Sequence, residues 1–424
     1  MKTLTIGLLG CGNVGGGVYR LIKDFEHETA HRHNLKINIK KILVKDANDP
    51  RLNFVDKGLL TEDVAQVVED PEITLVAEFM GGEQPAADYM LRALNHQKTV
   101  VTANKVALAL NWPKLQKAAQ ENGVGLYYEA SVCGAIPIIR VLNSSLHANR
   151  VNHLMGIVNG TTNYILSRMT DEGDSYETVL ADAQRLGLAE PDPFTDVEGL
   201  DAAYKLSIMS SLAFHARVPF DKVFCQGITK VTPMDIACGK EMGYVVKLLA
   251  IAKRHGMTLE TRVHPTFIPK EHPLASVSGS FNAVYLKGHA CQEMMFQGRG
   301  AGDMPTASAV VADILNAAAD VHPHPTFKNE EAPAPEMTFA DNWETRFFVR
   351  LSVKDTPGAL MQIAGCFAQE GISIASMMQK TAVEDGRLPL IFVTHQTFEK
   401  SMGAALDHLD PEIAQVESVI RVEA

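Results

Sequence analysis

The stretch "LTIGLLGCGNVGGG" (residues 4–17) decides the fold of this chain. It starts as a continuous apolar run, which is typical of a parallel strand that is buried on both faces. Glycines follow at the spacing G-x-G-x-x-G, and the residues after them have helical spacing. Such glycines permit a tight turn and let backbone N–H groups approach a pyrophosphate at the helix N-terminus. A glycine-rich turn can also bind nothing, but here the strand, the turn and the helix agree. The residues expected to contact a dinucleotide are Gly10, Gly12, Asn13, Val14 and Gly15.

The first third of the chain continues this alternation of strand and helix. A helix is expected over residues 85–97, and further strands are expected over residues 37–45, 73–80 and 98–104. Alternation of this kind predicts a parallel sheet with helices on its faces. We therefore expect a Rossmann-like α/β nucleotide-binding domain over residues 1–133. A later helix, residues 304–319, predicts that residues of about 300–322 return to complete this domain.

The pattern changes after the first domain, and an α+β domain is expected over residues 134–299. Strand-like runs lie at residues 150–160 and 261–268, and helical segments are expected at residues 176–186, 198–216 and 240–255. A stretch with prolines and acidic residues, 323–345, is typical of a linker. Residues 346–424 return to strands and helices and form a third predicted domain.

Net charge and cysteine usage narrow the classes of function. The formal net charge of −11 argues against a nucleic-acid partner and against an anionic membrane surface. No apolar run is long enough for a membrane span. The six cysteines are scattered and form no CxxC pair, which favours reduced thiols in a cytoplasmic protein and argues against a zinc site.

The choice between NAD and NADP depends on the end of the second strand. An acidic residue there usually selects NAD, because it binds the 2′-hydroxyl group of the ribose. Here Lys45 precedes Asp46, and Arg51 and Lys57 follow and could hold a 2′-phosphate. The sequence favours NADP, with NAD as the alternative through Asp46.

The segment "EGLDAAYKLSIMSSLAFHA" (residues 198–216) predicts an almost wholly buried helix that keeps one lysine. Asp201 and Lys205 lie four residues apart and share a helix face. A surface ion pair is the simplest interpretation, but apolar residues stand where a solvent-facing stripe would be polar. Buried lysines are rare unless they are paired or functional. Asp201 and Lys205 are therefore candidate catalytic residues.

The loop before this helix concentrates acidic residues. "GLAEPDPFTDVEGLD" (residues 187–201) contains Glu190, Asp192, Asp196, Glu198 and Asp201. A solvated surface loop is the plain alternative. However, two prolines restrict the backbone, and the loop leads directly to Lys205. Carboxylates placed there could bind a cationic substrate group and tune the lysine as an acid.

Two further residues are candidates for ligand or cation binding because of the sequence around them. Lys105 directly follows a predicted strand, at the edge where open parallel sheets bind ligands, although a solvated loop lysine is an equal alternative. Glu129 is the single carboxylate in "YYEASVCGAIPII" (residues 127–139). A loop of small residues can turn several carbonyl groups toward one point, which suits a hard cation. A plain strand–turn–helix junction is the alternative for this segment.

Six motifs follow one another along the chain: GCGNVGGG, TANK, YEASVCGAIPII, NGTTNYIL, AEPDPFTDVEGLDAAYKL and GRGAGDMPTAS. In these motifs and their order, and over essentially its whole length, the chain resembles the family of bacterial homoserine dehydrogenases with a C-terminal ACT domain. The family reduces aspartate 4-semialdehyde to homoserine with NAD(P)H, on the route to threonine, methionine and isoleucine. The resemblance implies a homo-oligomer, a dimer or a tetramer, with a second domain that serves catalysis and dimerisation.

The resemblance also implies a role for each matching position. Lys205 resembles the proton-donating lysine, and Lys105 the second active-site lysine, beside both substrate and cofactor. The acids that hold the substrate's amino group and order the site match Glu190, Asp196 and Asp201. The cofactor-contacting glycines match Gly187 and Gly302. The ligands of a monovalent cation, usually sodium, match Glu129 and the backbone carbonyls of Val132, Gly134 and Ile136. Leu188 stands where the family often has tyrosine, which puts any substrate contact through that hydroxyl in doubt.

Residues 346–424 resemble the ACT fold, βαββαβ, with the turn "DTPGAL" (residues 355–360) after the first strand. ACT domains bind small effectors, often amino acids, at interfaces between paired copies, which implies feedback inhibition by threonine. A domain retained only for assembly is the alternative. Two other functions also have ACT and Rossmann features: a 2-hydroxy-acid dehydrogenase, which typically uses a histidine–carboxylate pair, and a cofactor-bound sensor, which would not need Lys205.

Overall fold

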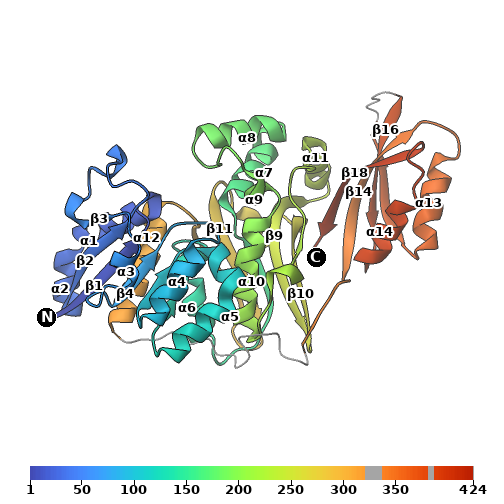
Figure 1. Ribbon diagram of the computed structural model, residues 1–424. Helices are drawn as coiled ribbons and strands as arrows, with labels where there is room; N and C mark the ends of the chain where they lie inside the picture. Colours follow the sequence, from blue (N-terminus) through green and yellow to red (C-terminus); the bar gives the residue numbers. More distant parts are fainter. Residues whose placement is uncertain (320–336, 381–385, 424) are drawn as a thin grey trace.

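The structure is a computed structural model that describes residues 1–319, 337–380 and 386–423. Figure 1 shows three bodies that follow one another along the molecule: an N-terminal body, a central body and a C-terminal body. The end of the chain returns to the junction between the central and C-terminal bodies. Among the described residues, none of the helices combines the length and the apolar character that a membrane crossing requires.

A six-stranded parallel sheet forms the N-terminal body. The strands, in spatial order, are β3 (Leu60–Thr61), β2 (Leu35–Leu43), β1 (Lys2–Leu9), β4 (Leu75–Glu78), β5 (Thr99–Thr102) and β6 (Leu126–Tyr127). The order changes direction between β1 and β4, and this switch point is where doubly wound sheets bind ligands. The helices of this body are α1 (Asn13–Asp24), α2 (Glu26–His33), α3 (Ala65–Val68), α4 (Ala86–Asn95) and α5 (Lys105–Glu121).

Helix α12 (Asp303–Ala318) comes from much later in the chain and packs against α1. A Cβ on Gly17 would lie 2.9 Å from the carbonyl oxygen of Asp303, so the two helices approach closely where Gly17 has no side chain. Ala307 and Ile314 are buried in the same apolar cluster as residues of β1. The described part of the segment expected to return to this body therefore does so, and residues 320–322 lie outside the described residues.

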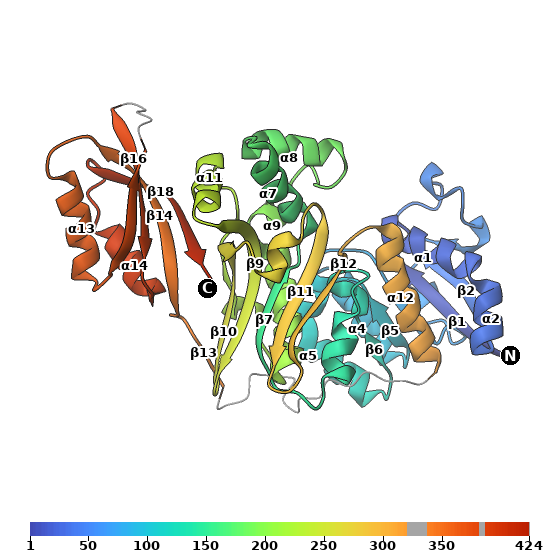
Figure 2. The same cartoon turned by 180° about the vertical axis from the view of Figure 1, so that it is seen from behind.

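The central body is built on five antiparallel strands with helices on one side (Figure 2). In spatial order the strands are β12 (Gln292–Arg299), β11 (Phe281–Gly288), β7 (Val151–Ile157), β9 (Tyr244–His255) and β10 (Thr258–Pro269), and the short β8 (Phe224–Cys225) pairs with β10. The helices are α6 (Ile138–Arg140), α7 (Gly160–Glu172), α8 (Tyr176–Arg185), α9 (Phe194–Val197), α10 (Leu200–Phe214) and α11 (Pro233–Glu241).

One element of the central body differs from its prediction. Residues 240–255 were expected to be helical, but α11 ends at Glu241 and Tyr244–His255 form strand β9. The strand lies between β7 and β10, and residues 246–252 are all buried. A strand buried on both faces has a continuous apolar run, which periodicity cannot distinguish from a buried helix.

The C-terminal body has the element order strand, helix, strand, strand, helix, strand. Its elements are β14 (Glu344–Lys354), α13 (Ala359–Gln369), β15 (Ile374–Gln379), β16 (Arg387–Thr394), α14 (Glu399–Asp407) and β18 (Ala414–Val422), with the short β17 (Thr397–Phe398) beside β14. Strand β18 pairs with β10 in parallel, with Thr266 opposite Arg421. This pairing makes one twelve-stranded sheet of the central and C-terminal bodies.

The predicted linker, residues 323–345, lies outside the described residues as far as residue 336. Its described remainder is not a free linker, because β13 (Thr338–Phe339) pairs with β10 and the side chains of Met337 and Trp343 are buried. Strand β14 begins at Glu344, slightly before the predicted start of the third domain. The apolar residues of this segment pack on the central body, which its prolines and acids did not indicate.

Candidate active site

The glycine turn lies at the switch point of the parallel sheet. Gly10 follows β1 with a φ of +100°, which a residue with a Cβ rarely adopts. A Cβ on Gly15 would collide with the carbonyl group of Gly10, so only glycine lets α1 start this close to the strand. A Cβ on Gly12 would meet nothing within 4 Å, and no side chain caps the N-terminus of α1. The turn therefore leaves the room and the free N–H donors that a pyrophosphate requires.

Glu78, which the sequence reading missed, fixes the other side of this crevice. Its buried carboxylate ends β4 and accepts hydrogen bonds from Thr102 Oγ1 and from the backbone N–H of Met80, both at 2.6 Å. Burial raises the pKa of Glu78 above its ordinary value. Asn104 caps α5 by accepting from the N–H of Ala107 (3.0 Å). These contacts fix the start of α5, where Lys105 stands. The sequence did contain a signal for Glu78, because it is the single acidic residue in the apolar run of residues 73–80.

Two lysines from different bodies meet at Asp201. Lys205 Nζ lies 2.7 Å from Asp201 Oδ2, one turn away on α10. Lys105 Nζ lies 3.2 Å from the other oxygen, Oδ1. The side chain of Lys205 is 10% exposed and that of Lys105 is 39% exposed, so Lys205 stands at the inner side of the site and Lys105 at the open side. The Asp201–Lys205 pair is therefore not a surface ion pair.

Lys205 keeps one donor available. Its ammonium group donates to the carbonyl oxygen of Val158 and to Asp201, each at 2.7 Å. An ammonium group has three N–H donors. Among the contacts of the described residues, the third N–H has no hydrogen-bond acceptor. A substrate oxygen can take this position.

Asn159 is a second residue that the sequence reading missed. Its side-chain nitrogen donates to Asp196 Oδ1 (2.7 Å) and to Asp201 Oδ2 (2.8 Å), so one amide group sets the separation of two carboxylates. Its oxygen accepts from the N–H of Thr162 (2.8 Å) and caps α7. Asn159 belongs to the motif NGTTNYIL, which carried the family resemblance but had no assigned role.

The charges of the site act on one another. Burial alone would raise the pKa of Asp201, but the ammonium groups of Lys205 and Lys105 outweigh it and hold that pKa below its ordinary value. The charge of Asp201, supported by Asp196 and Glu190, raises the pKa of Lys105. Burial, and then the charge of Asp201, raise the pKa of Asp196. At neutral pH Asp201 is therefore ionised, and Lys105 beside it is charged.

The remaining candidates near the site are exposed residues of the acidic loop and two glycines with unusual backbone conformations. Glu190 and Leu188 are exposed, and the carbonyl oxygen of Leu188 accepts from Thr161 Oγ1 (2.7 Å). Gly187 has a φ of +71° just after α8, and Gly302 has a φ of +120° at the N-cap of α12. Both glycines stand where the backbone requires a conformation that other residues rarely adopt.

The basic residues expected near the ribose are all exposed. Lys45 lies two residues beyond the end of β2, and Lys57 begins a short 3-10 helix just before β3. Arg51 is 88% exposed and forms an ion pair with Asp49 (2.6 Å). Asp46 accepts a hydrogen bond from the N–H of Asn48 and shapes the turn after β2.

Glu129 is buried in a short 3-10 helix (Glu129–Ser131), and its carboxylate meets the start of α6. Its two carboxylate oxygens accept hydrogen bonds from the N–H groups of Ile139 (2.8 Å) and Arg140 (2.9 Å). The carbonyl oxygen of Ile136 accepts from the N–H of Ile138 (2.7 Å). Within the described ranges, no group of three or more histidine, cysteine or acidic side chains is arranged to hold a metal ion. Any cation here would depend on one carboxylate and backbone carbonyl groups.

The fold and the site meet two requirements of a nicotinamide-dependent dehydrogenase. A dinucleotide has room at the helix N-terminus beside the sheet's switch point, and a buried lysine, a residue type that can act as an acid, is held by a carboxylate nearby. Membership of the nicotinamide-dependent dehydrogenases does not determine the substrate. Comparison with known proteins identifies the family.

Two family models match the chain. The model described as "Homoserine dehydrogenase, NAD binding domain" matches residues 10–129, and the model described as "Homoserine dehydrogenase" matches residues 137–315. The homoserine dehydrogenase of Bacillus subtilis (strain 168) is 41% identical, and the match covers 100% of this chain and 99% of the relative. The chain therefore belongs to the homoserine dehydrogenase family and is an NAD(P)-dependent oxidoreductase.

Solved structures agree with this assignment. The crystal structure of a homoserine dehydrogenase from Thiobacillus denitrificans is 39% identical and has a TM-score of 0.91, with coverage of 100% of this chain and 99% of that chain. A hyperthermophilic archaeal homoserine dehydrogenase in complex with NADPH is 25% identical, has a TM-score of 0.64 and covers 75% of this chain and 98% of its own. The family sets aside the 2-hydroxy-acid dehydrogenase and the non-catalytic sensor.

Proposed function

We propose that the enzyme interconverts aspartate 4-semialdehyde and homoserine, with NADP as the preferred dinucleotide, in the biosynthesis of threonine, methionine and isoleucine. The observation that carries the mechanism is the contact of Lys205 and Lys105 with the two oxygens of Asp201. This arrangement supplies a fixed proton donor and a second fixed positive charge on one carboxylate.

Lys205 is the proposed proton donor. Its third N–H points away from the two acceptors that hold the other two, Val158 and Asp201, and is available to the carbonyl oxygen of the aldehyde. When bound, the nicotinamide ring supplies the hydride-transfer chemistry. The ammonium group stabilises the negative charge that develops on the substrate oxygen and then delivers a proton to it.

The acidic residues and Lys105 are proposed to bind the two charged groups of the substrate's amino-acid end. Asp196 and Glu190, on the approach to Lys205, suit its ammonium group. Lys105 is 39% exposed at the open side of the site and suits the substrate's carboxylate. Because it begins α5 just after β5, at the edge where such sheets bind ligands, it is also proposed to contact the cofactor. Asp201 orders both lysines and so has a catalytic as well as a substrate-positioning role.

The proposed preference for NADP rests on Lys45, Arg51 and Lys57 in the segment after β2, because all three are exposed and their positive charge suits a 2′-phosphate. The archaeal relative solved with NADPH supports this choice. Gly10, Gly12, Asn13, Val14 and Gly15 are proposed to hold the pyrophosphate, and Gly187 and Gly302 to border the cofactor.

A monovalent cation, sodium in the first place, is proposed at Glu129. The carboxylate and the carbonyl oxygens of Val132, Gly134 and Ile136 would supply a hard, oxygen-only ligand set. Gly134 has a φ of +51°, and a Cβ on it would lie 2.8 Å from the backbone of Gly300, so the loop takes a course that only glycine permits. The cation would stabilise this loop, which borders the site.

The C-terminal body is proposed to be an ACT domain that binds threonine. A pocket of about 100 Å³ lies at the turn after β14, and its lining includes Asp355, Thr356, Leu360 and Gln379. Asp355 could bind the ammonium group of an amino acid, and the N–H groups at the start of α13, which no side chain caps, its carboxylate.

The same region supports a homo-oligomer, a dimer or a tetramer. Strand β15 is the edge of the twelve-stranded sheet beside the pocket, and Met361 and Met377 nearby are 74% and 48% exposed. An exposed apolar edge strand is suited to pairing with a second copy. The central body's edge strand β12 is the proposed second contact. The six free cysteines favour a cytoplasmic location.

One assay tests the proposed reaction. Oxidation of homoserine with NADP, followed by NADPH absorbance, should proceed, and the reverse reaction should consume NADPH with aspartate 4-semialdehyde. No turnover with homoserine, or a faster turnover with a 2-hydroxy acid, would contradict the proposal.

A further inference from the structure

One side chain of the central body, Gln226, connects the C-terminal body to the segment that contacts the active-site helix. Gln226 follows β8, and its backbone N–H donates to the carbonyl oxygen of Val263 in β10 (2.8 Å). Its side-chain oxygen accepts a hydrogen bond from Arg421 of β18, and its side-chain nitrogen lies 3.5 Å from the carbonyl oxygen of Val419. Gln226 is thus bonded to both bodies.

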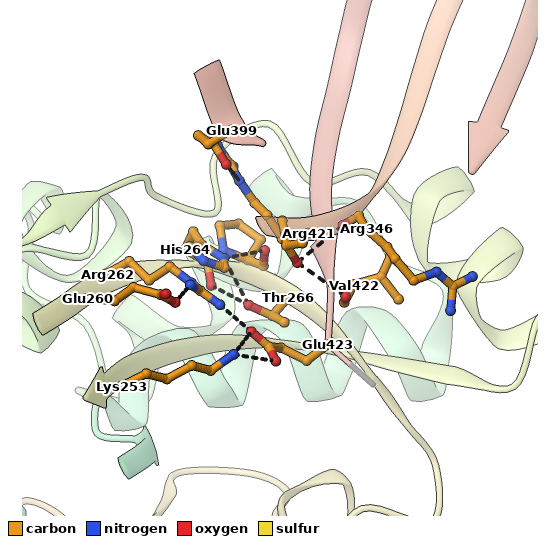
Figure 3. A network of polar contacts seen from close by, with 12 residues as sticks. Lys253, Glu260, Arg262, His264, Thr266, Arg346, Glu399, Arg421, Val422 and Glu423 are labelled. Carbon is orange, nitrogen blue, oxygen red and sulfur yellow. Dashed lines mark hydrogen bonds and ion pairs between the residues drawn. The ribbon is translucent and has the colours of Figure 1, made fainter. Parts of the chain in front are cut away.

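Arg421 is fixed on the C-terminal side. Its side chain is 4% exposed, and two of its nitrogens contact the carboxylate of Glu399 at the start of α14. The guanidinium lies 5.2 Å from the ring centre of Phe224 in the central body and 5.9 Å from that of Phe347 in the C-terminal body. Figure 3 shows Arg421 between Glu399 and the strands of the central body. A displacement of β18 or α14 is therefore passed to Gln226.

Residues 225–229, here called the strap, also touch the turn that precedes α10. The backbone N–H of Ile228 donates to the carbonyl oxygen of Val197 (2.8 Å). The thiol of Cys225 donates to the carbonyl oxygen of Glu198 (3.2 Å). The strap thus connects the C-terminal body to the turn by direct hydrogen bonds.

Two glycines remove the space between the strap and this turn. A Cβ on Gly227 would collide with the backbone of Val197 and Glu198. Gly199 has a φ of +82°, and a Cβ on it would lie 3.1 Å from Cys225 Sγ. Closely packed backbones transmit displacement rather than absorb it, so a shift of the strap moves the turn.

The turn stands between two carboxylates of the site. Asp196 directly precedes residues 197–199, and Asp201 is the second residue of α10. The single amide of Asn159 bonds both carboxylates, at 2.7 and 2.8 Å. A shift of the turn therefore changes the placement of these carboxylates relative to Asn159 and to Lys105.

We propose that Gln226 and Arg421 are positioning residues, which place Asp196 and Asp201 according to the position of the C-terminal body. The inference rests on the proposed roles of these two carboxylates. Other contacts also join the two bodies, among them those of Lys253 and Arg262 with Glu423 and that of Arg350 with Asp235, but among the described residues the strap is the one that bonds the turn before α10. Because the strap contacts the turn between Asp196 and Asp201, we expect a shift of the C-terminal body to change the binding of homoserine and not that of the dinucleotide.

The test uses the full-length chain and compares kcat and the two KM values of wild type, Gln226→Leu and Gln226→Glu. Leucine fills a similar volume but accepts no hydrogen bond. We expect Gln226→Leu to raise the KM for homoserine by roughly two- to thirtyfold, the range that coupling positions reach, with the KM for NADP unchanged. Gln226→Glu keeps an acceptor for Arg421 and should restore the wild-type KM. Equal KM values for homoserine in wild type and Gln226→Leu would overturn the proposal.

Lys253→Met is the matched control. It removes another contact between the same two bodies, to Glu423 at 2.9 Å, while Arg262 still pairs with Glu423. Its KM for homoserine should stay at the wild-type value. An increase equal to that of Gln226→Leu would mean that any weakening of the contact between the two bodies has this effect, and it would overturn the proposal. Arg421→Lys keeps the charge beside Glu399 but shortens the reach to Gln226. Arg421→Lys should therefore also raise the KM for homoserine and leave the KM for NADP unchanged. This second variant keeps the test valid if Gln226→Leu does not fold.

Asp196→Asn and Asp201→Asn, measured in parallel, separate the two levels of the argument. If neither changes the KM for homoserine or kcat, the proposed roles of the carboxylates are wrong and the positioning inference falls with them. If both change the kinetics while Gln226→Leu does not, only the positioning inference is wrong.

Discussion

Lys105 and Asp201 lie 3.2 Å apart although they belong to different bodies, at the first residue of α5 and in the first turn of α10. Buried Arg217 holds the two helices together: it donates to the carbonyl oxygen of Ala109 in α5 (2.6 Å) and lies 3.4 Å from Ser207 Oγ in α10. Because Asp201 also contacts Lys205, one carboxylate fixes the distance between both lysines. The site therefore depends on the docking of two bodies.

Lys205→Met should abolish proton donation and preserve the fold. Methionine keeps the length and the apolar stem, and the loss of a general acid typically lowers the rate by ~10²–10⁴-fold. The measurement is kcat with homoserine, with dinucleotide affinity as the check on the glycine turn. Lys247→Met is the matched control, because Lys247 is also buried and bonds to Val277 and Asn163. It should lose stability but keep kcat. A near-normal kcat in folded Lys205→Met would transfer the role of donor to Lys105.

Asp201→Asn should move the alkaline limb of the pH–rate profile to lower pH. The charge of Asp201 raises the pKa of Lys105, so the lysine keeps its proton to higher pH in the wild type. Without that charge the pKa falls, and Lys105 loses its proton at lower pH. The measurement is kcat/KM for homoserine across the alkaline range. Asp192→Asn, an exposed acid of the same loop, is the control and should leave the limb in place. An unmoved limb in Asp201→Asn would show that Lys105 does not titrate in the profile.

Arg51→Ala should reduce the use of NADP selectively. A hydrogen bond to a charged group is worth about 1.5–3 kcal/mol, so the loss should lower kcat/KM for NADP by roughly 13- to 160-fold. The kcat/KM for NAD should not change, because NAD has no 2′-phosphate. Arg185→Ala, another exposed arginine, is the control. A wild-type preference for NAD would contradict the prediction and point to Asp46 as the ribose-binding acid.

Sodium should stabilise the wild-type protein through Glu129. A ligand that binds only the folded state raises the unfolding midpoint, so Tm should be higher in sodium chloride than in choline chloride at equal ionic strength. Glu129→Gln should lower Tm in both salts, because one of the N–H groups of Ile139 and Arg140 loses its acceptor. The difference between the salts should also vanish in this variant. A difference that persists would place the cation elsewhere.

Asp355→Ala should weaken inhibition by threonine and leave kcat unchanged. The substitution removes the carboxylate proposed to bind the effector's ammonium group at the pocket after β14. The measurement is the threonine concentration that halves the rate. Glu412→Ala is the control, since Glu412 pairs with Lys354 of the pocket lining but does not line the pocket itself. Equal sensitivity of wild type and Asp355→Ala would exclude this pocket as the threonine site.

The spacing of residues in the sequence determined the first strand and its glycine turn, the shared helix face of Asp201 and Lys205, and the family resemblance. An apolar run before G-x-G-x-x-G predicts a buried strand and a turn that opens a helix, because the steric demands of the turn act between neighbouring residues. The spacing of Asp201 and Lys205 places them on one helix face for the same local reason, and the surrounding apolar residues indicate burial. The motifs quoted for the family resemblance led to the family that the comparisons confirm.

Tertiary structure decided what depends on distant partners. Residues 244–255 form a strand because β7 and β10 flank them, although their apolar run is equally suited to a buried helix. Lys105 acquires its contact with Asp201, and Asn159 its two carboxylates, only when separate segments dock. The same holds for β18, whose pairing with β10 joins two bodies into one sheet. Hydrogen bonds and ion pairs between remote segments leave no periodic trace in a sequence, because each partner is chosen by the fold as a whole.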